Sequence, residues 1–171
     1  MKPEEIRDKL QAKVGTVEFV AGPGDAAVIV PAEKWHEAAT FLRDEPSLSF
    51  RFLRALCGVD RLAAGHIEVV CHLFSYENKH AIVLKTKVPR QGAELPTVSD
   101  VWPAAEWHER EAFDLLGVRF AGHRDLRRLL LPDDWVGHPL LKDYKEPESY
   151  QGIPMQRPVN GGAPVLTTES K

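Results

Sequence analysis

The chain has 171 residues, of which 43% are hydrophobic and 27% are charged. This length and composition are typical of an ordinary globular protein with one hydrophobic core, and no apolar run approaches the roughly 20 residues that span a bilayer. A formal net charge of −3 argues against a dedicated nucleic-acid binder, which normally carries a basic patch.

The first 13 residues, MKPEEIRDKLQAK, contain acids and lack an apolar stretch. They match neither a secretory signal nor an Arg-rich transit peptide, so we expect a cytoplasmic protein. Cys57 and Cys71 stand far apart in sequence, which excludes a site made of four cysteines for zinc or an iron–sulfur cluster. Both are predicted to be reduced thiols in the core.

The N-terminal half alternates helical and strand patterns. Apolar residues at helical spacing predict an amphipathic helix over 4–13, which Gly15 can end. Two β-branched runs at 16–20 and 26–30 are separated by the turn formers AGPGD. Pro31 then opens a second helix to about Arg43, whose buried stripe is Trp35, Ala38, Ala39 and Leu42.

The strongest strand pattern lies between 66 and 89. HIEVVCHLFSY and AIVLKTKVP flank a bend at Asn78 and Lys79, so an antiparallel hairpin is predicted. The preceding segment, 50–56, is consistent with either a helical turn or a short strand. A connector at 90–97 comes next, and Ser99 or Asp100 can cap a helix that is interrupted near Pro103 and continues to Leu116.

These elements predict an α+β fold. A small mixed or antiparallel sheet is covered by helices over residues 1–117, where Gly117 takes the left-handed position that ends the last helix. Residues 118–171 form an extended C-terminal docking arm. After Tyr144 the Pro- and Gly-rich chain has no period, which indicates either disorder or an extended path over another protein.

Charged and aromatic residues are interleaved most densely between Trp102 and Tyr144. Glu106, Arg110 and Asp114 are spaced for i,i+4 ion pairs on a solvated helix face. Trp102 and Trp107 beside Arg110 instead favour a protein–protein interface. We expect that replacing Arg110 with Glu, or ending the chain after Phe120, abolishes assembly of a complex while the domain still folds.

Two other interpretations of this region stay open at this point. His123, Arg124, Arg127 and Arg128 offer charges for an anionic ligand, and His123, Asp133, Asp134 and His138 offer ligands for an independent metal-dependent enzyme. Neither set has the spacing of a known site. Nucleotide-binding and serine-hydrolase motifs are absent from the sequence, so no catalytic, cofactor-binding or metal-binding residue is expected on this chain.

The run WPAAEWHEREAFDLLGVRFAGHRDLRRLLLPDDWVGHPLLKDY resembles the signature region of the 30 kDa subunit (the C subunit) of NADH-quinone oxidoreductase, respiratory complex I. It matches the family's ERE motif, G-x-x-F-x-G-H, an R-x-L-L-P-D-D-W segment and G-H-P-L-x-K-D-Y. Ala104 departs from the family's WPG turn. The LCGVD and EVVCHL segments upstream resemble the family more loosely.

On this resemblance the following residues are assigned to the family signature and to a partner interface: Trp102, Trp107, Glu109, Arg110, Glu111, Asp114, Gly117, Phe120, Gly122, His123, Arg128, Pro132, Asp133, Asp134, Trp135, Gly137, His138, Pro139, Lys142, Asp143 and Tyr144.

The resemblance implies a peripheral-arm subunit that docks chiefly beside the D subunit at the cytoplasmic face of the cell inner membrane. It implies that FMN, iron–sulfur clusters and quinone are bound by partner subunits, and that the complex passes electrons from NADH to quinone coupled to proton translocation. An equivalent subunit of a membrane-bound hydrogenase or a related dehydrogenase is the alternative within the same fold.

Overall fold

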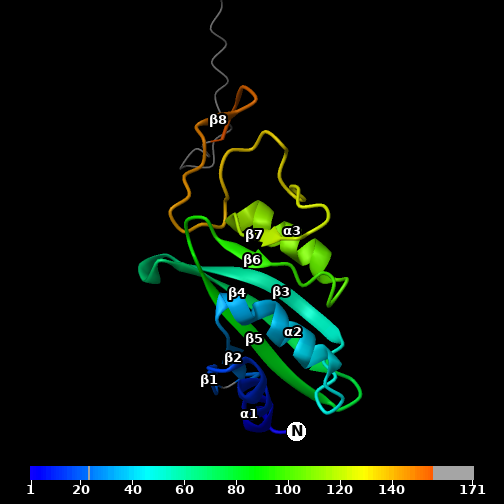
Figure 1. Cartoon of the computed structure of the whole chain (residues 1–171). Helices are drawn as coiled ribbons and strands as arrows, with labels where there is room; N and C mark the ends of the chain where they lie inside the picture. Colours follow the sequence, from blue (N-terminus) through cyan, green and yellow to red (C-terminus); the bar gives the residue numbers. More distant parts are fainter. Residues whose placement is uncertain (23, 156–171) are drawn as a thin grey trace, which may run out of the picture.

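A five-stranded sheet and three helices on one of its faces form the body of the protein (Figure 1). The computed structural model describes residues 1–22 and 24–155. The helices are α1 (Pro3–Val14), α2 (Trp35–Asp44) and α3 (Ala105–Leu116), with short 3₁₀ turns at Ala32–Lys34 and Leu62–Ala64. The strands of the main sheet are β1 (Glu18–Val20), β2 (Ala27–Ile29), β3 (Phe52–Arg61), β4 (His66–Ser75) and β5 (His80–Pro89).

The sheet has the order β1-β2-β5-β4-β3. Only β2 and β5 are parallel; the other neighbouring pairs are antiparallel. The predicted mixed sheet with helices on it is therefore confirmed. The predicted hairpin is β4 and β5, whose register is unbroken from His66 opposite Pro89 to Ser75 opposite His80.

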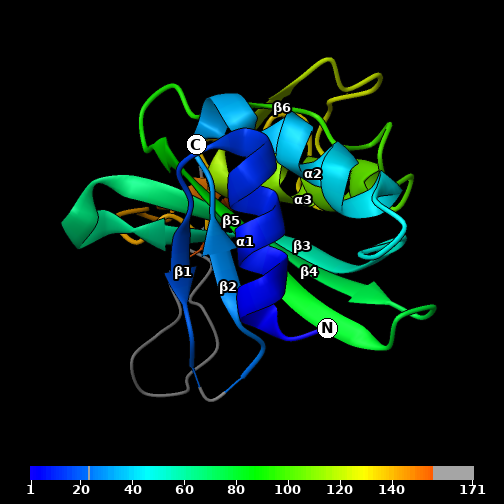
Figure 2. The same ribbon diagram turned by 60° about the horizontal axis from the view of Figure 1, so that its bottom comes forward.

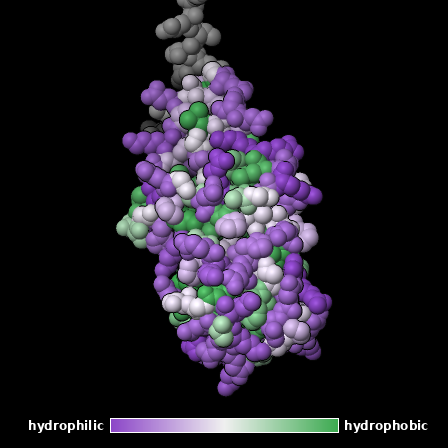
Figure 3. Space-filling view, viewed as in Figure 1, coloured by the Kyte–Doolittle hydropathy of each residue, from purple (hydrophilic) through white to green (hydrophobic). Residues whose placement is uncertain are grey.

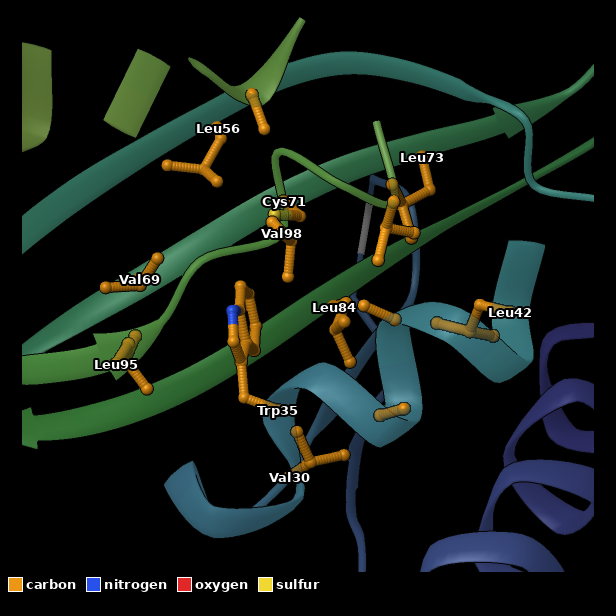
Figure 4. Close-up of a cluster of buried hydrophobic side chains, with 14 of the residues drawn as sticks. Val30, Trp35, Leu42, Leu56, Val69, Cys71, Leu73, Leu84, Leu95 and Val98 are labelled. Carbon is orange, nitrogen blue, oxygen red and sulfur yellow. The ribbon is translucent and has the colours of Figure 1, made fainter. Parts of the chain in front are cut away.

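Helices α1 and α2 form where the apolar spacing predicted them, and they contact each other over the sheet (Figure 2). Helix α1 buries Ile6, Leu10 and Val14. Helix α2 buries the predicted stripe that begins at Trp35. In Figure 4, Trp35 projects from the start of α2 toward the strands and lies beside Leu84. Each stripe leaves the opposite face of its helix polar, which fixes the side that packs on the sheet.

The segment that sequence could not assign is part of an edge strand. Residues 52–61 form β3, which pairs with β4 and contains a register shift between Leu53 and Ala55. This pairing also corrects the expectation for Cys57, which is exposed, whereas Cys71 is buried. Cys57 follows the core residue Leu56, so its side chain points to the face of the sheet opposite the helices.

Helix α3 begins later than predicted. Ser99 and Asp100 do not cap it; they lie in a turn in which the Trp102 N–H donates to the Val98 carbonyl. The Asp100 carboxylate lies 2.8 Å from a ring nitrogen of His36, on α2. This turn also buries Trp102, whose Nε1–H donates to the Phe50 carbonyl at 2.8 Å. The turn is therefore set by contacts with distant segments.

The expected boundary at residue 117 does not separate the core from the rest of the chain. Two short strands, β6 (Glu94–Pro96) and β7 (Arg119–Ala121), pair in parallel, and Val118 and Phe120 are buried in the same core as the helices. The core therefore extends through residue 121, because these apolar side chains are withdrawn from water only if β7 is part of the domain.

A small hairpin of β8 (Ser149–Tyr150) and β9 (Ile153–Pro154) forms in a stretch for which no period predicted structure. The Tyr150 ring lies 5.1 Å from that of Trp135, and its hydroxyl donates to Asp134. The remaining part of the tail, 156–171, lies outside the described residues. No helix among the described residues has the length and apolar character to cross a membrane.

Candidate functional site: an anchored segment with exposed apolar residues

Residues 122–144, which we call the anchored segment, are held against the end of α3 by the buried carboxylate of Asp114. One of its oxygens accepts hydrogen bonds from the backbone N–H groups of Leu129, Leu130 and Leu131 at 2.7–3.0 Å. The other accepts from the Arg128 guanidinium at 2.7 Å. Burial alone would raise the pKa of Asp114, but these donors outweigh it and the pKa is lowered.

Two arginines complete this anchor through backbone carbonyls. Arg110 is buried on α3 and donates to the carbonyls of residues 127 and 128. Arg128 also donates to the carbonyls of Trp135 and Gly137. The expected i,i+4 pairs within α3 are therefore wrong, because Arg110 and Asp114 bind groups of the anchored segment and Glu106 pairs with Arg124. Replacing Arg110 with Glu would therefore remove these hydrogen bonds to the anchored segment, in addition to any effect on a partner-binding surface.

Acids on this chain also occupy the remaining arginines of the basic cluster. Arg124 binds both carboxylate oxygens of Glu106, and Arg127 contacts Asp125. His123 has no exposed side-chain surface, and its Nε2–H donates to the Glu106 carbonyl. This arrangement offers no unpaired cluster of cations, so the anionic-ligand interpretation is not supported.

A second anchor connects the segment to the hairpin. Arg90, at the end of β5, donates to both oxygens of the buried Asp60 and to the Asp143 carboxylate. Asp60 also accepts from the Lys142 N–H at 2.8 Å. Burial would raise the pKa of Asp60, but Arg90 and this N–H lower it. Sequence patterns did not single out Arg90 and Asp60 as site residues; the Asp of the LCGVD segment was the only available signal.

Two glycines allow close contacts in the anchored segment. Gly117 has φ +78°, as expected for the position that ends α3, and its N–H donates to the Phe113 carbonyl. An added Cβ would lie 2.8 Å from the imidazole of His138, whose Nδ1 contacts the Asp114 carbonyl. A Cβ on Gly137, at φ +83°, would lie 2.9 Å from the Tyr144 ring. These rings therefore cover the glycine backbone directly.

We expect Gly117→Ala to lower the free energy of unfolding by about 2 kcal/mol, because left-handed alanine costs about 1–2 kcal/mol and His138 must also move. Urea denaturation of the purified chain measures this loss. Gly65→Ala is the matched control, since Gly65 also has positive φ, at +69°, but its Cβ would meet nothing within 4 Å. Equal losses in the two variants would contradict a specific role for the His138 contact.

The proposed metal ligands are not brought together. His123 contacts the Glu106 carbonyl, Asp134 contacts Tyr150 and His138 contacts the Asp114 carbonyl. Within 1–22 and 24–155 there is no group of three or more His, Cys, Asp or Glu side chains that could hold a metal ion. The structure therefore gives no support to an independent metal-dependent enzyme.

Several large apolar side chains of this region face solvent. Leu130, Val136 and Leu140 of the anchored segment are 61%, 79% and 53% exposed, and Trp107 on α3 is 58% exposed. The surface is mostly hydrophilic, with small apolar patches scattered over it, some of them in the upper part, where the segment and α3 lie (Figure 3). Of the signature residues on α3, Glu109, Arg110 and Asp114 are buried, whereas Trp107 and Glu111 are exposed.

A domain whose buried charges fix a segment with exposed apolar side chains has the construction of a docking subunit of a larger assembly. Residues 28–150 match the sequence profile of the family described as respiratory-chain NADH dehydrogenase, 30 Kd subunit. The chain belongs to this family and is a subunit of NADH-quinone oxidoreductase, complex I of the respiratory chain.

Individual relatives agree with this assignment. The C subunit of NADH-quinone oxidoreductase from Roseiflexus castenholzii is 47% identical over 133 residues, which are 77% of this chain and 75% of the relative. The corresponding protein of Chlorobium phaeobacteroides is 44% identical over 73% of this chain and 76% of its own. The C/D subunit of the enzyme from Phocaeicola vulgatus is 48% identical over 68% of this chain, and the match covers 22% of that relative.

Solved structures agree with the fold. A trypsin-resistant fragment of Nqo5 superposes with a TM-score of 0.61 at 28% identity, covering 74% of this chain and all of the fragment. A chain of an archaeal membrane-bound sulfane sulfur reductase, a respiratory membrane complex, superposes with a TM-score of 0.64 at 32% identity, covering 78% of this chain and 79% of its own. The hydrogenase-type alternative is not favoured by these matches.

Proposed function

We propose that this chain is a structural subunit of the peripheral arm of complex I, and that its anchored segment docks against the D subunit. The observation that carries the proposal is the exposure of Leu130, Val136 and Leu140 on a segment whose backbone is held by buried carboxylates. A rigid segment loses little conformational entropy on binding, so its apolar side chains contribute more of their burial energy to affinity.

The polypeptide named as a joint C/D subunit supports the D subunit as the neighbour. In this proposal the chain carries no catalytic residue, and FMN, the iron–sulfur clusters and quinone are bound by partner subunits. The chain then reaches the cytoplasmic face of the membrane only through the assembled complex. Its contribution to NADH oxidation is to hold the redox subunits in position.

Replacing Leu130 and Val136 together with Asp tests the docking surface. We expect the free chain to keep its stability within about 0.5 kcal/mol, since both side chains are exposed. Binding should weaken by about 30-fold for each central contact worth about 2 kcal/mol. The measurement is affinity purification of a tagged copy from its native membranes, followed by identification of co-purifying subunits and an NADH-to-quinone activity assay.

Val20→Asp is the matched control, because Val20 is also exposed but lies on β1, at the opposite end of the molecule from the segment (Figure 1). The Val20→Asp variant should co-purify with the D subunit, and the purified complex should keep full activity. Normal assembly of the double variant would refute docking through this segment. Recovery of the wild-type chain with hydrogenase subunits would assign it to a related complex, and recovery of the chain alone would refute membership of any complex.

A further inference from the structure

A buried carboxyl group that has no cationic partner among the described residues lies behind the turn before α3. Glu109 has no solvent exposure, and its carboxyl oxygens contact the Thr97 hydroxyl at 2.5 Å and the Val98 N–H at 2.7 Å. Among the described residues, the only basic side chain within 4.0 Å of it is the imidazole of His123, at that limit. Buried carboxylates are normally paired with a cation, so this group needs another explanation.

His123 is poorly placed to supply the missing positive charge. Its Nδ1 accepts from the Asp125 N–H at 3.1 Å, so the ring proton is on Nε2, which donates to the Glu106 carbonyl. Both nitrogens of the neutral ring are therefore engaged. A second proton on Nδ1 would break the bond from Asp125.

The elements around Glu109 within 1–22 and 24–155 supply no other cation. Asp100, in the turn, disfavours a charge on Glu109, and Cys71 of β4 contributes a thiol whose own pKa burial raises well above its usual value. Arg43 of α2 donates to the carbonyls of residues 100 and 101. Glu106, on the same helix as Glu109, is neutralised by Arg124.

Two hydroxyl groups connect this carboxyl to a cleft. Thr97 Oγ1 lies 2.8 Å from Ser99 Oγ, and either oxygen can be the donor. Thr97 and Ser99 both line an open cleft of about 480 Å³, together with Asp100, Glu106 and Arg124. With Glu109 ionised, Ser99 donates to Thr97 and Thr97 donates to the carboxylate. With Glu109 neutral, the carboxyl donates to Thr97 and Thr97 donates to Ser99, so both protonation states are satisfied.

We propose that Glu109 is a buried proton-binding site that exchanges its proton with the solvent of this cleft through the hydroxyls of Thr97 and Ser99. A water-borne proton binds Ser99 Oγ, Ser99 passes its own proton to Thr97 Oγ1, and Thr97 passes its own to Glu109. Each hydroxyl ends with one proton and a reversed orientation, and one proton has moved from solvent to the carboxylate.

The acidity of the group agrees with this geometry. Burial raises the pKa of Glu109 to about 7, against the opposing effect of the hydrogen bonds from Thr97 and Val98. Both protonation states are therefore populated near neutral pH. The site does not depend on the docking proposal, because Glu109, Thr97 and Ser99 all precede the anchored segment.

Infrared spectroscopy of the full-length chain, with carboxyl-labelled glutamate, tests the proposal. We expect a carboxylic-acid carbonyl band that titrates near pH 7 and disappears in Glu109→Gln. After a pH jump, Ser99→Ala should leave the midpoint unchanged but slow proton uptake, because protons can then enter only where Thr97 itself lines the cleft. Thr97→Val should slow uptake as well and raise the midpoint, because it removes a donor to the carboxylate.

Ser47→Ala, which removes a hydroxyl that contacts only Lys9 and Glu45, is the control and should keep the wild-type uptake rate. Absence of a glutamic-acid band that titrates near neutral pH would overturn the site. Wild-type uptake in both Ser99→Ala and Thr97→Val would overturn the path. Both comparisons leave Glu109 unchanged, so together they decide the path independently of the Glu109→Gln variant.

Discussion

Asp114→Asn is expected to lower the free energy of unfolding by about 3–5 kcal/mol, which is the usual cost of removing one partner of a buried ion pair. Three backbone N–H groups and Arg128 converge on the Asp114 carboxylate. An asparagine oxygen has only two lone pairs, and its NH₂ group would face a donor. The variant therefore leaves Arg128 without its counterion and at least one N–H unsatisfied.

Urea denaturation at pH 7 measures this loss, and limited proteolysis shows where the structure opens. Cleavage should appear first within the anchored segment, since the strands and α1 do not depend on Asp114. Glu111→Gln is the matched control: it removes an exposed carboxylate from the same helix and should change stability by less than about 0.5 kcal/mol. A loss of less than about 1 kcal/mol in Asp114→Asn would show that the anchor contributes little.

The stability of the wild-type chain should fall between pH 4.5 and pH 7 because of Glu109. The pKa of this group is about 7 in the folded chain, whereas its ordinary value is 4.5. Between these two pH values the chain therefore takes up a proton when it folds. The contribution is fully present below pH 4.5 and lost as pH rises through 7. A difference of about 2.5 pKa units corresponds to about 3 kcal/mol. The lowered pKa values of Asp60 and Asp114 act in the opposite sense, below pH 4.

Glu109→Gln isolates this effect from the titration of histidines. The amide resembles the neutral acid, because its oxygen can accept from Val98 and its NH₂ group can donate to Thr97. Urea denaturation should therefore give similar stabilities for the variant and the wild type at pH 5. At pH 8 the variant should be more stable than the wild type by about 3 kcal/mol. A wild type that is the more stable protein at pH 8 would contradict this explanation of Glu109.

The outcomes for α3 show why sequence patterns locate an element but not its contacts. Its end at Gly117 was predicted, because left-handed backbone selects glycine whatever surrounds it. Its start at Ala105 was not, because the turn before it is shaped by the buried Trp102 and by His36 from another helix. The conformation of the 50–56 segment likewise depends on distant contacts, since a strand exists only where a partner strand supplies hydrogen bonds.

For the candidate site, too, some features could be predicted from the sequence and others could not. The density of charged and aromatic residues from Trp102 to Tyr144 and the family signature located the region and its family. The assignment of the whole signature to a partner interface, however, treated Glu109, Arg110 and Asp114 as equivalent to Trp107. The structure places those three inside the chain, and it adds Asp60 and Arg90 from distant strands.

Features that depend only on neighbours along the chain could be predicted from the amino acids: the amphipathic helices α1 and α2, the β4–β5 hairpin, the glycine that ends α3 and the family. Which charges pair and which apolar residues stay exposed follows instead from contacts between distant segments. An exposed i,i+4 pair contributes about 0.2–0.5 kcal/mol, whereas a buried charge without a partner costs several kcal/mol. The larger cost decides the pairing, so Asp114 binds Arg128 and three distant N–H groups. In the backbone that these bonds hold, Leu130 and Val136 face solvent.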